Sequence, residues 1–214
     1  MSLVLRSYWR SSCSWRVRIA LHWKQLPFET VPVHLVADGG HQHSMEHRAL
    51  NPMRELPVLT ANGESLAQSM AILEYLEETQ PHPPLLPADP IARARVRQMA
   101  EVVNSGTQPI QNLRVMQHLG RVYDLPRDQQ VEWSRDWIAR GLGALETLVA
   151  THGGQCCFGD DVSYADLCLV PQLYNARRFG VNMDDLPTLV AVEGRLVEMP
   201  AFAAAHPDQQ PDAA

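Results

Sequence analysis

The chain has 214 residues, of which 45% are apolar and 20% are charged, and its formal net charge is −6. This length supports one large domain or two modest ones, and the composition is that of an ordinary globular protein. Lys24 is the only lysine, so no basic surface for nucleic acid is expected, and no apolar run reaches the roughly 18 residues of a membrane-spanning helix.

The beginning of the chain, MSLVLRSYWR, lacks the long apolar segment of a secretory signal. The cysteines show no disulfide framework; they are Cys13, Cys156, Cys157 and Cys168. We therefore expect a reduced, soluble, cytoplasmic protein that binds neither nucleic acid nor a membrane.

The first 80 residues alternate strand and helix patterns. In chain order we predict a strand over 3–8, a helix over 14–24, a strand over 28–33, a weak helix over 42–50, two short strands within 56–68 and a helix over 69–79. The two short strands flank Asn62-Gly63, a strong hairpin signal. This β-α-β-α-β-β-α order indicates a mixed sheet with helices on its faces.

Residues 81–90 contain five prolines and predict a linker, because neither a helix interior nor a central strand accepts them. Beyond the linker the pattern is helical, in segments separated by further prolines: 91–106, 110–120, 127–152, 164–179 and 188–198. Residues 206–214 are expected to form a loose tail. The predicted organisation is an α/β domain over 1–80, a linker over 81–90 and an all-helical domain over 91–214.

Four small polar residues, Ser11, Ser12, Cys13 and Ser14, lie where the first strand ends and the first helix begins. One interpretation is a helix cap supplied by Ser12 or Ser14. The other is a site that ionises the thiol of a ligand, because the first turn of a helix offers free N–H groups and a partial positive charge. Lowering a thiol pKa by one unit takes about 1.4 kcal/mol, which one hydrogen bond can supply. The residues alone leave both interpretations open.

Five motifs resemble the zeta class of the cytosolic glutathione transferases, also known as the maleylacetoacetate isomerase family. They are SSCSWRVRIAL (11–21), LNPMRELPVL (50–59), QSMAILEYLEE (68–78), QPIQNLRV (108–115) and DVSYADLCLVPQ (161–172). The resemblance covers nearly the whole chain, and SSCSWR is its most specific part. It implies an α/β thioredoxin-like N-terminal domain followed by an all-α C-terminal domain, and it also implies a homodimer.

The resemblance further implies that glutathione is the cofactor. Ser11 is the expected hydrogen-bond donor to the glutathione sulfur, with Ser12 and Cys13 in support. The implied glutathione-binding residues are Ser11, Ser12, Cys13, Ser14, Trp15, Arg16, Gln42, Leu56, Pro57, Gln68, Ser69, Gln108, Asn112, Leu113 and Arg114. Gln68 and Ser69 are expected at the γ-glutamyl carboxylate, since a helix start binds anions, and Gln42 at the glycine end.

Several assignments keep alternatives. The Leu56–Pro57 bond is expected to be cis, so that the Leu56 backbone pairs with an extended peptide, but Pro57 also suits an ordinary turn. Arg114 stands where the zeta pattern usually has a small residue. Arg10 and Arg178 are implied for the carboxylates of a small diacid substrate, although Arg178 also suits the end of a helix as a plain cation.

The implied activity is a glutathione-dependent cis–trans isomerisation of maleylacetoacetate to fumarylacetoacetate, a step of aromatic amino acid catabolism. Reversible addition of a thiolate turns the double bond into a single bond that can rotate before the thiolate leaves. Three alternatives stay open: isomerisation of maleylpyruvate, thiol transfer through Cys13, and glutathione binding without catalysis.

Ser163 and Asp166 in VSYADL have the S-x-x-D spacing of a capping box, with Val162 and Leu167 placed as its hydrophobic staple. We therefore expect Asp166 to be buried and structural rather than a catalytic acid.

His43 and His47 could share one helix face, but no third ligand lies at a suitable spacing, and no metal site is expected. The segment that carries them looks exposed to solvent. The adjacent Cys156 and Cys157 are expected to be small apolar filler, because neighbouring cysteines seldom form a disulfide.

Overall fold

The computed structural model describes residues 2–213, which form two compact units. The first unit runs to Pro84 and includes the segment from Glu198 onward, and the second unit is Leu85–Val197. The end of the helical region therefore groups with the N-terminal residues rather than with the other helices. Within 2–213, none of the helices combines the length and the apolar character needed to cross a membrane.

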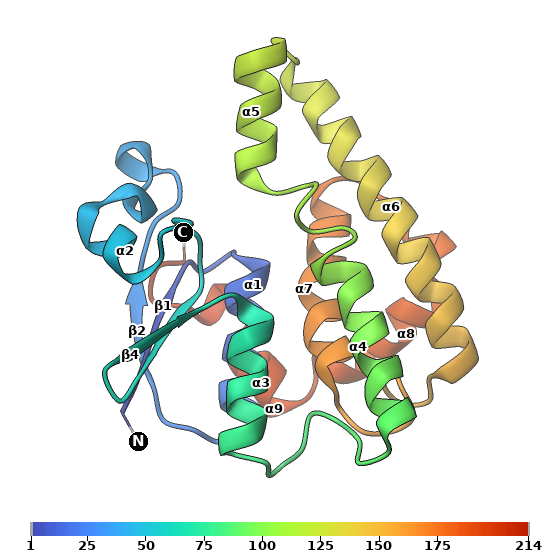
Figure 1. Cartoon of the computed structure of the whole chain (residues 1–214). Helices are drawn as coiled ribbons and strands as arrows, with labels where there is room; N and C mark the ends of the chain where they lie inside the picture. The colour runs from blue at the N-terminus through green and yellow to red at the C-terminus, as the bar shows by residue number, and fades with distance from the viewer. Residues whose placement is uncertain (1, 214) are drawn as a thin grey trace. The chain divides into compact units, whose positions relative to one another are not determined.

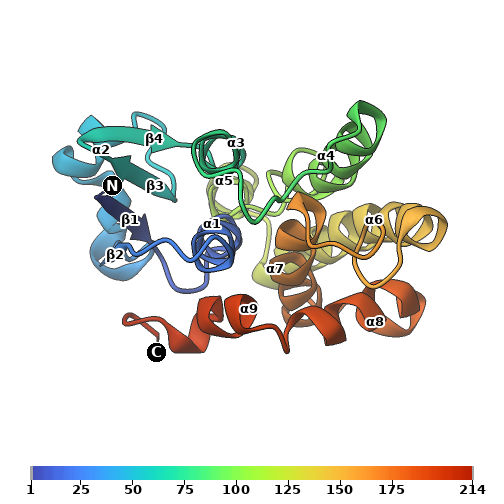
Figure 2. The ribbon, with the colours of Figure 1, turned by 90° about the horizontal axis from the view of Figure 1, so that it is seen from below.

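The first unit is built on a four-stranded sheet (Figure 1), and its strand order β2-β1-β3-β4 can be followed in Figure 2. Its elements are β1 (Leu3–Ser7), α1 (Ser12–Trp23), β2 (Glu29–Pro32), α2 (Met45–Leu50), β3 (Val58–Ala61), β4 (Glu64–Ala67) and α3 (Ser69–Thr79). β1 runs parallel to β2 and antiparallel to β3, and β3 pairs with β4 in a hairpin. The hairpin turns at Asn62 and Gly63, whose φ angles of 51° and 92° are the positive values that a tight hairpin turn requires. The predicted element order and mixed sheet are confirmed.

Helix α1 lies between α3 and α9 (Pro200–Ala205), as Figure 2 shows from below. Nine of its 12 residues are buried, including the apolar Val17, Ile19 and Leu21. Because neighbours cover it on two sides as well as at the sheet, even Arg16 and Arg18 have no exposed surface. The helix begins at Ser12, two residues before the predicted start.

The C-terminal residues contradict the expected loose tail. After α9, residues Pro207–Gln209 form a short 3₁₀ turn, and Phe202 and Ala205 are buried in the first unit. Farther along, the carboxylate of Asp212 accepts the backbone N–H of Trp9 at 3.0 Å. The prediction was wrong for 206–213 because a polar composition does not reveal contacts with backbone groups that are distant in sequence; Ala214 lies outside the described residues.

The second unit is helical. Its elements are α4 (Pro90–Asn104), α5 (Leu113–Tyr123), α6 (Arg127–His152), α7 (Tyr164–Arg178) and α8 (Pro187–Leu196). Helix α7 packs against α4, α6 and α8, and 12 of its 15 residues are buried. The helical segments are confirmed with shifted ends. Pro90, expected in the linker, is the first residue of α4, because Asp89 caps that helix by accepting the Ala92 N–H at 2.8 Å.

Helix α7 begins with the predicted capping box. Asp166 has no exposed surface, and one of its carboxylate oxygens accepts both the N–H and the hydroxyl of Ser163 at 2.8 Å. The other oxygen accepts the N–H of Cys157 at 2.8 Å. Burial raises the pKa of Asp166, and the same surroundings raise the pKa of the Cys157 thiol well above its usual value. The structural interpretation of Asp166 is confirmed.

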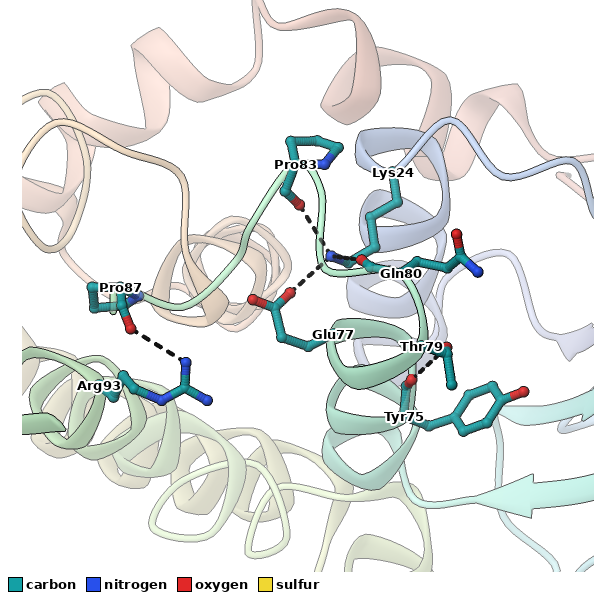
Figure 3. A network of polar contacts seen from close by, with 8 residues as sticks. All are labelled: Lys24, Tyr75, Glu77, Thr79, Gln80, Pro83, Pro87 and Arg93. Atoms are coloured by element: carbon teal, nitrogen blue, oxygen red, sulfur yellow. Dashed lines mark hydrogen bonds and ion pairs between the residues drawn. The ribbon is translucent and has the colours of Figure 1, made fainter. Parts of the chain in front are cut away.

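The residues that follow α3 are held by the single lysine of the chain (Figure 3). Lys24 is buried, and its ammonium donates to the Glu77 carboxylate at 2.8 Å and to the carbonyls of Gln80 and Pro83 at 2.7 and 3.0 Å. These contacts use all three N–H donors of the ammonium. In the second unit, Arg93 donates to the Pro87 carbonyl at 3.3 Å. The proline-rich stretch is therefore anchored by side chains although it has no regular structure.

Candidate active site

Ser11 is the N-cap of α1. Its extended backbone (φ −71°, ψ 119°) places the side-chain oxygen to accept the Ser14 N–H at 3.3 Å. The cap is thus Ser11, whereas the sequence suggested Ser12 or Ser14 for that role. Capping uses the acceptor capacity of the hydroxyl and leaves its O–H able to donate. One residue can therefore serve both as the cap and as a donor to a ligand.

The other members of the serine cluster differ in exposure. Ser12 and Ser14 are 7% and 0% exposed, whereas Ser11 and Cys13 are partly exposed. Cys13 is a free thiol. No acidic side chain lies in the first turn of α1, so the partial positive charge of the helix start is not neutralised there. Ser11 and Cys13 are the two members of the cluster with surface to offer a ligand.

The start of α3 lies close to this cluster. The guanidinium of Arg16 on α1 donates to the hydroxyl of Ser69, the first residue of α3, at 3.4 Å. Gln68 precedes it with φ 70° and ψ 112°, a strained conformation for a residue other than glycine. Strain of this kind is concentrated at ligand sites. The first turn of α3 also has no acidic side chain. The starts of α1 and α3, whose own first turns carry no acidic side chain, thus lie near each other, and the Glu55 carboxylate accepts the side-chain amide of Gln68 at 3.4 Å.

Gln42 lies buried in a 3₁₀ turn, His41–His43. Its amide nitrogen donates to the Leu35 carbonyl at 3.2 Å, and its amide oxygen is buried with no partner among residues 2–213. Gly40 permits this packing, since a Cβ on it would lie 2.6 Å from the Gln42 amide nitrogen. The orphaned amide oxygen is a ready acceptor for a ligand N–H.

The histidines near Gln42 do not share a helix face, which corrects the sequence expectation. His43 ends the 3₁₀ turn and is exposed, whereas His47 on α2 is buried with its ring nitrogen Nε2 3.1 Å from the Glu55 carbonyl oxygen. Across the described part of the chain, no cluster of three or more His, Cys, Asp or Glu side chains suits a metal ion.

The Leu56–Pro57 bond is cis, as predicted, and it leads directly into β3. A second cis bond, His82–Pro83, was not predicted. Leu56 packs in a small cluster with Tyr8, Trp9 and Val33, which connects this turn to the loop before α1.

The second unit holds the remaining expected glutathione residues. Asn112 caps α5, its amide oxygen accepting the Arg114 N–H at 3.2 Å. Leu113 and Arg114 are exposed beside it, and Gln108 is buried four residues earlier, its N–H bonded to the Val103 carbonyl at 2.8 Å. These positions form one short segment around the start of α5.

The arginines divide into two kinds. Arg177 forms two hydrogen bonds with the Glu193 carboxylate on α8, one of 2.7 Å, and this contact raises the pKa of Arg177. Its role is therefore to join α7 to α8. Arg178 is exposed and lies over the Phe179 ring at 5.0 Å, and Arg10 in the first unit lies over the Trp9 ring at 4.9 Å. Stacking on aromatic rings leaves the planar edge of a guanidinium able to bind a carboxylate.

Sequence reasoning missed two residues, Arg18 and Asp212, that contact the loop between β1 and α1, although Arg18 had a visible signal. Arg18 interrupts the apolar run of RVRIAL, where a charged residue must have buried partners. Asp212 gave no signal, because it lies in a polar segment far from the loop in sequence.

Comparison with known proteins shows the family of the chain. The family model described as "Glutathione S-transferase, N-terminal domain" matches residues 10–79. "Probable maleylacetoacetate isomerase 2" of Drosophila melanogaster is 48% identical over 209 residues, 98% of this chain and 89% of that protein. The crystal structure of maleylacetoacetate isomerase from Anaeromyxobacter dehalogenans 2CP-1, with glutathione bound in its active site, is 50% identical with a TM-score of 0.89, covering 100% of this chain and 98% of that one.

A third relative is a holo structure of maleylpyruvate isomerase, described as a bacterial glutathione S-transferase in the zeta class. It is 39% identical, with a TM-score of 0.95 and complete coverage of both chains. The sequence identity extends over nearly the full length of each relative, so the similarity is not confined to one motif or one domain. The chain belongs to the maleylacetoacetate isomerase family, the zeta class of the glutathione transferases.

Proposed function

We propose that the protein converts maleylacetoacetate to fumarylacetoacetate with glutathione as cofactor. The observation that carries the proposal is the pair of helix starts at α1 and α3, which the contact between Arg16 and Ser69 joins and whose own first turns carry no acidic side chain. A helix start favours negative charge, so this pair suits a ligand that has both a thiolate and a carboxylate.

The donor set fits glutathione, a tripeptide with two carboxylate ends, amide groups and one thiol. Gln68 and Ser69 would hold the γ-glutamyl carboxylate at the start of α3. Gln42, whose buried amide oxygen has no partner among residues 2–213, would meet the glycine end. The remaining contacts, which the family resemblance implies, are assigned to Ser12, Cys13, Ser14, Trp15, Arg16, Leu56, Pro57, Gln108, Asn112, Leu113 and Arg114.

When bound, glutathione supplies a sulfur nucleophile that adds reversibly to the conjugated double bond of the substrate. Ser11 donates its O–H to that sulfur, and the start of α1 adds its partial positive charge. Both effects lower the pKa of the thiol toward neutrality. A pKa near the working pH suits a group that must both attack and leave.

Arg10 and Arg178 are assigned to the carboxylates of the diacid substrate. A guanidinium binds a carboxylate through two parallel hydrogen bonds, which fixes the substrate's orientation as well as its position. Holding the double bond in reach of the sulfur contributes to the rate by proximity.

The test is turnover of maleylacetone and of maleylpyruvate, each with and without glutathione. We expect glutathione-dependent isomerisation with a higher kcat/KM for maleylacetone. The zeta-class maleylpyruvate isomerase with the TM-score of 0.95 makes the shorter diacid the second candidate. A higher kcat/KM for maleylpyruvate would transfer the assignment to that substrate, and absence of turnover with both would leave a binding protein.

The protein is further assigned as a cytoplasmic homodimer, in which residues 1–80 bind glutathione and the helical region after the linker at 81–90 contributes substrate contacts. The family resemblance is the support for this arrangement. Light scattering at micromolar concentration should give the mass of two chains; the mass of one chain would refute the dimer.

A further inference from the structure

Arg18 is fully buried, and its guanidinium contacts neutral oxygens. Nη1 donates to the Ser7 hydroxyl at 3.0 Å and to the Tyr8 carbonyl at 3.4 Å, Nη2 donates to the Trp9 carbonyl at 2.8 Å, and Nε donates to the Ala205 carbonyl at 3.1 Å. Burial lowers the pKa of Arg18 to about 10, so the group remains a cation at neutral pH. A buried cation with these partners holds the backbone around it in place.

Three of these acceptors are consecutive in sequence: Ser7 ends β1, and Tyr8 and Trp9 follow it in the loop that leads to the serine cluster. The Tyr8 carbonyl that accepts from Arg18 also accepts the N–H of Ser11 at 3.0 Å. A single carbonyl oxygen therefore connects the guanidinium to the backbone of the residue assigned to the glutathione sulfur.

The peptide units of Trp9 are held from both sides. Its carbonyl accepts from Arg18 at 2.8 Å, and its N–H donates to the Asp212 carboxylate at 3.0 Å. Asp212 also attracts the Arg18 guanidinium and opposes the lowering of its pKa. Asp212 and Ala205 both belong to the C-terminal segment that packs on α1 through α9.

The side chains of the same loop face other parts of the site. Tyr8 and Trp9 pack with Val33 and Leu56, and the Arg10 guanidinium lies over the Trp9 ring at 4.9 Å. A movement of Trp9 would therefore displace both an assigned glutathione residue and an assigned substrate residue.

We propose that the C-terminal segment, together with Arg18 on α1, positions the loop between β1 and α1: Asp212 and Arg18 clamp the backbone of Trp9 and thereby fix the Ser11 hydroxyl and the Arg10 guanidinium. Neither clamp residue is assigned a contact with glutathione or substrate, so both act through the loop. This inference rests on the proposed function in one respect: it takes Ser11 as the donor to sulfur.

Asp212 offers the cleaner test, because it is partly exposed near the chain end and its removal should not prevent folding. We would compare Asp212→Ala, which removes the acceptor and the charge, with Asp212→Asn, which keeps an acceptor for the Trp9 N–H. Asp208→Ala is the matched control, since Asp208 is an exposed carboxylate of the same segment. Thermal unfolding checks that each variant is folded.

Three measurements report on the position of the loop between β1 and α1. For Asp212→Ala we expect faster amide hydrogen exchange at Trp9 and Ser11 without glutathione, a raised pKa of bound glutathione by ultraviolet titration of its thiolate, and about a tenfold lower kcat/KM for maleylacetone at pH 7. In Asp212→Asn the exchange rates, the pKa of bound glutathione and kcat/KM should return most of the way to the values of the parent protein. Asp208→Ala should match the parent protein in all three.

The proposal is overturned if Asp212→Ala is folded and leaves the exchange rates and the thiol titration unchanged. The proposal is also overturned if Asp208→Ala changes the exchange rates and the thiol titration as much as Asp212→Ala does. Exchange and titration need no substrate, so the two proposals fail separately. A parent protein that turns over neither diacid, together with a raised thiol pKa in Asp212→Ala, would refute the isomerase and support the clamp.

Discussion

Helices α1 and α7 both begin with a serine cap, and they differ in what stands three residues later. In α7 that residue is Asp166, whose carboxylate accepts three hydrogen bonds inside the protein. In α1 it is Ser14, and no acidic side chain lies in the first turn. A carboxylate at this position satisfies and neutralises the helix start from within. The start of α1 lacks that neutralisation, so its charge remains available to a ligand.

Replacing the internal anion of α7 should have the largest effect. Asp166→Ala leaves the N–H groups of Ser163 and Cys157 buried without their acceptor, which costs about 3–5 kcal/mol in the free energy of unfolding. Urea unfolding measures this loss of stability. The control is Asp161→Ala at an exposed position, for which a loss of less than about 0.5 kcal/mol is expected. Equal losses in the two variants would contradict the structural role of Asp166.

At the start of α1 the corresponding change should reduce function more than stability. Ser11→Ala removes the cap, at a cost of about 1 kcal/mol, and the donor to sulfur, worth about 1.5–3 kcal/mol. The pKa of bound glutathione should rise by about one to two units, and turnover at pH 7 should fall about tenfold or more. Titration of the thiolate absorbance against pH measures the pKa of bound glutathione, and an assay with maleylacetone measures the turnover.

Cys13→Ala is the control for Ser11→Ala. It should keep much of the turnover and mainly weaken glutathione binding, because the serine hydroxyl remains. If Cys13→Ala abolishes isomerisation while Ser11→Ala leaves the titration unmoved, Cys13 is the working residue and thiol transfer becomes the better assignment.

An anion can also be introduced at the start of α1. Cys13→Asp places a carboxylate in the first turn at a partly exposed position. We expect the free energy of unfolding to rise by about 0.5 kcal/mol through the helix dipole, while the pKa of bound glutathione rises by about one unit through repulsion. Cys13→Asn is the uncharged control. A lowered thiol pKa in Cys13→Asp would refute the electrostatic account.

The smallest expected effect is a difference in alkylation between the cysteines near the starts of α1 and α7. Burial raises the pKa of Cys156 to about 12 and raises the pKa of Cys157 well above its usual range, so both thiols stay protonated at pH 8. Only thiolates alkylate readily. Iodoacetamide should modify the partly exposed Cys13 alone in the folded protein, as peptide mass spectrometry can establish. Modification of Cys157 at a similar rate would contradict its burial.

Much of the fold could be predicted because its determinants are local. Alternation marks the strands, Asn62-Gly63 marks the hairpin, and Ser163 with Asp166 marks the start of α7. The start of α1 was misplaced by two residues because several adjacent serines are equally good caps. The strained φ of Gln68 could not be predicted, since nothing in its residue type requires it.

Local motifs allowed residues to be assigned to the site, whereas contacts between distant positions could not be predicted. The role of Ser11 toward the glutathione sulfur was inferred from the resemblance of its motif to the zeta class and stays a prediction, and its role as the cap of α1 was not predicted. The role of Asp212 was not predicted, because its contact with Trp9 joins positions that are 203 residues apart. His47 is buried through a contact of its ring with the Glu55 carbonyl, which the polar segment around it does not reveal.

Lys24, the single lysine, lies buried against Glu77 and two carbonyls. The folded chain therefore presents no lysine amine to acylating reagents, cross-linkers or enzymes that modify lysine side chains. Positive side-chain charge at its surface comes from arginine instead. An amine-selective label would reach a lysine only when the packing of α1 against α3 opens, so its rate of incorporation at Lys24 reports directly how often the first unit unfolds.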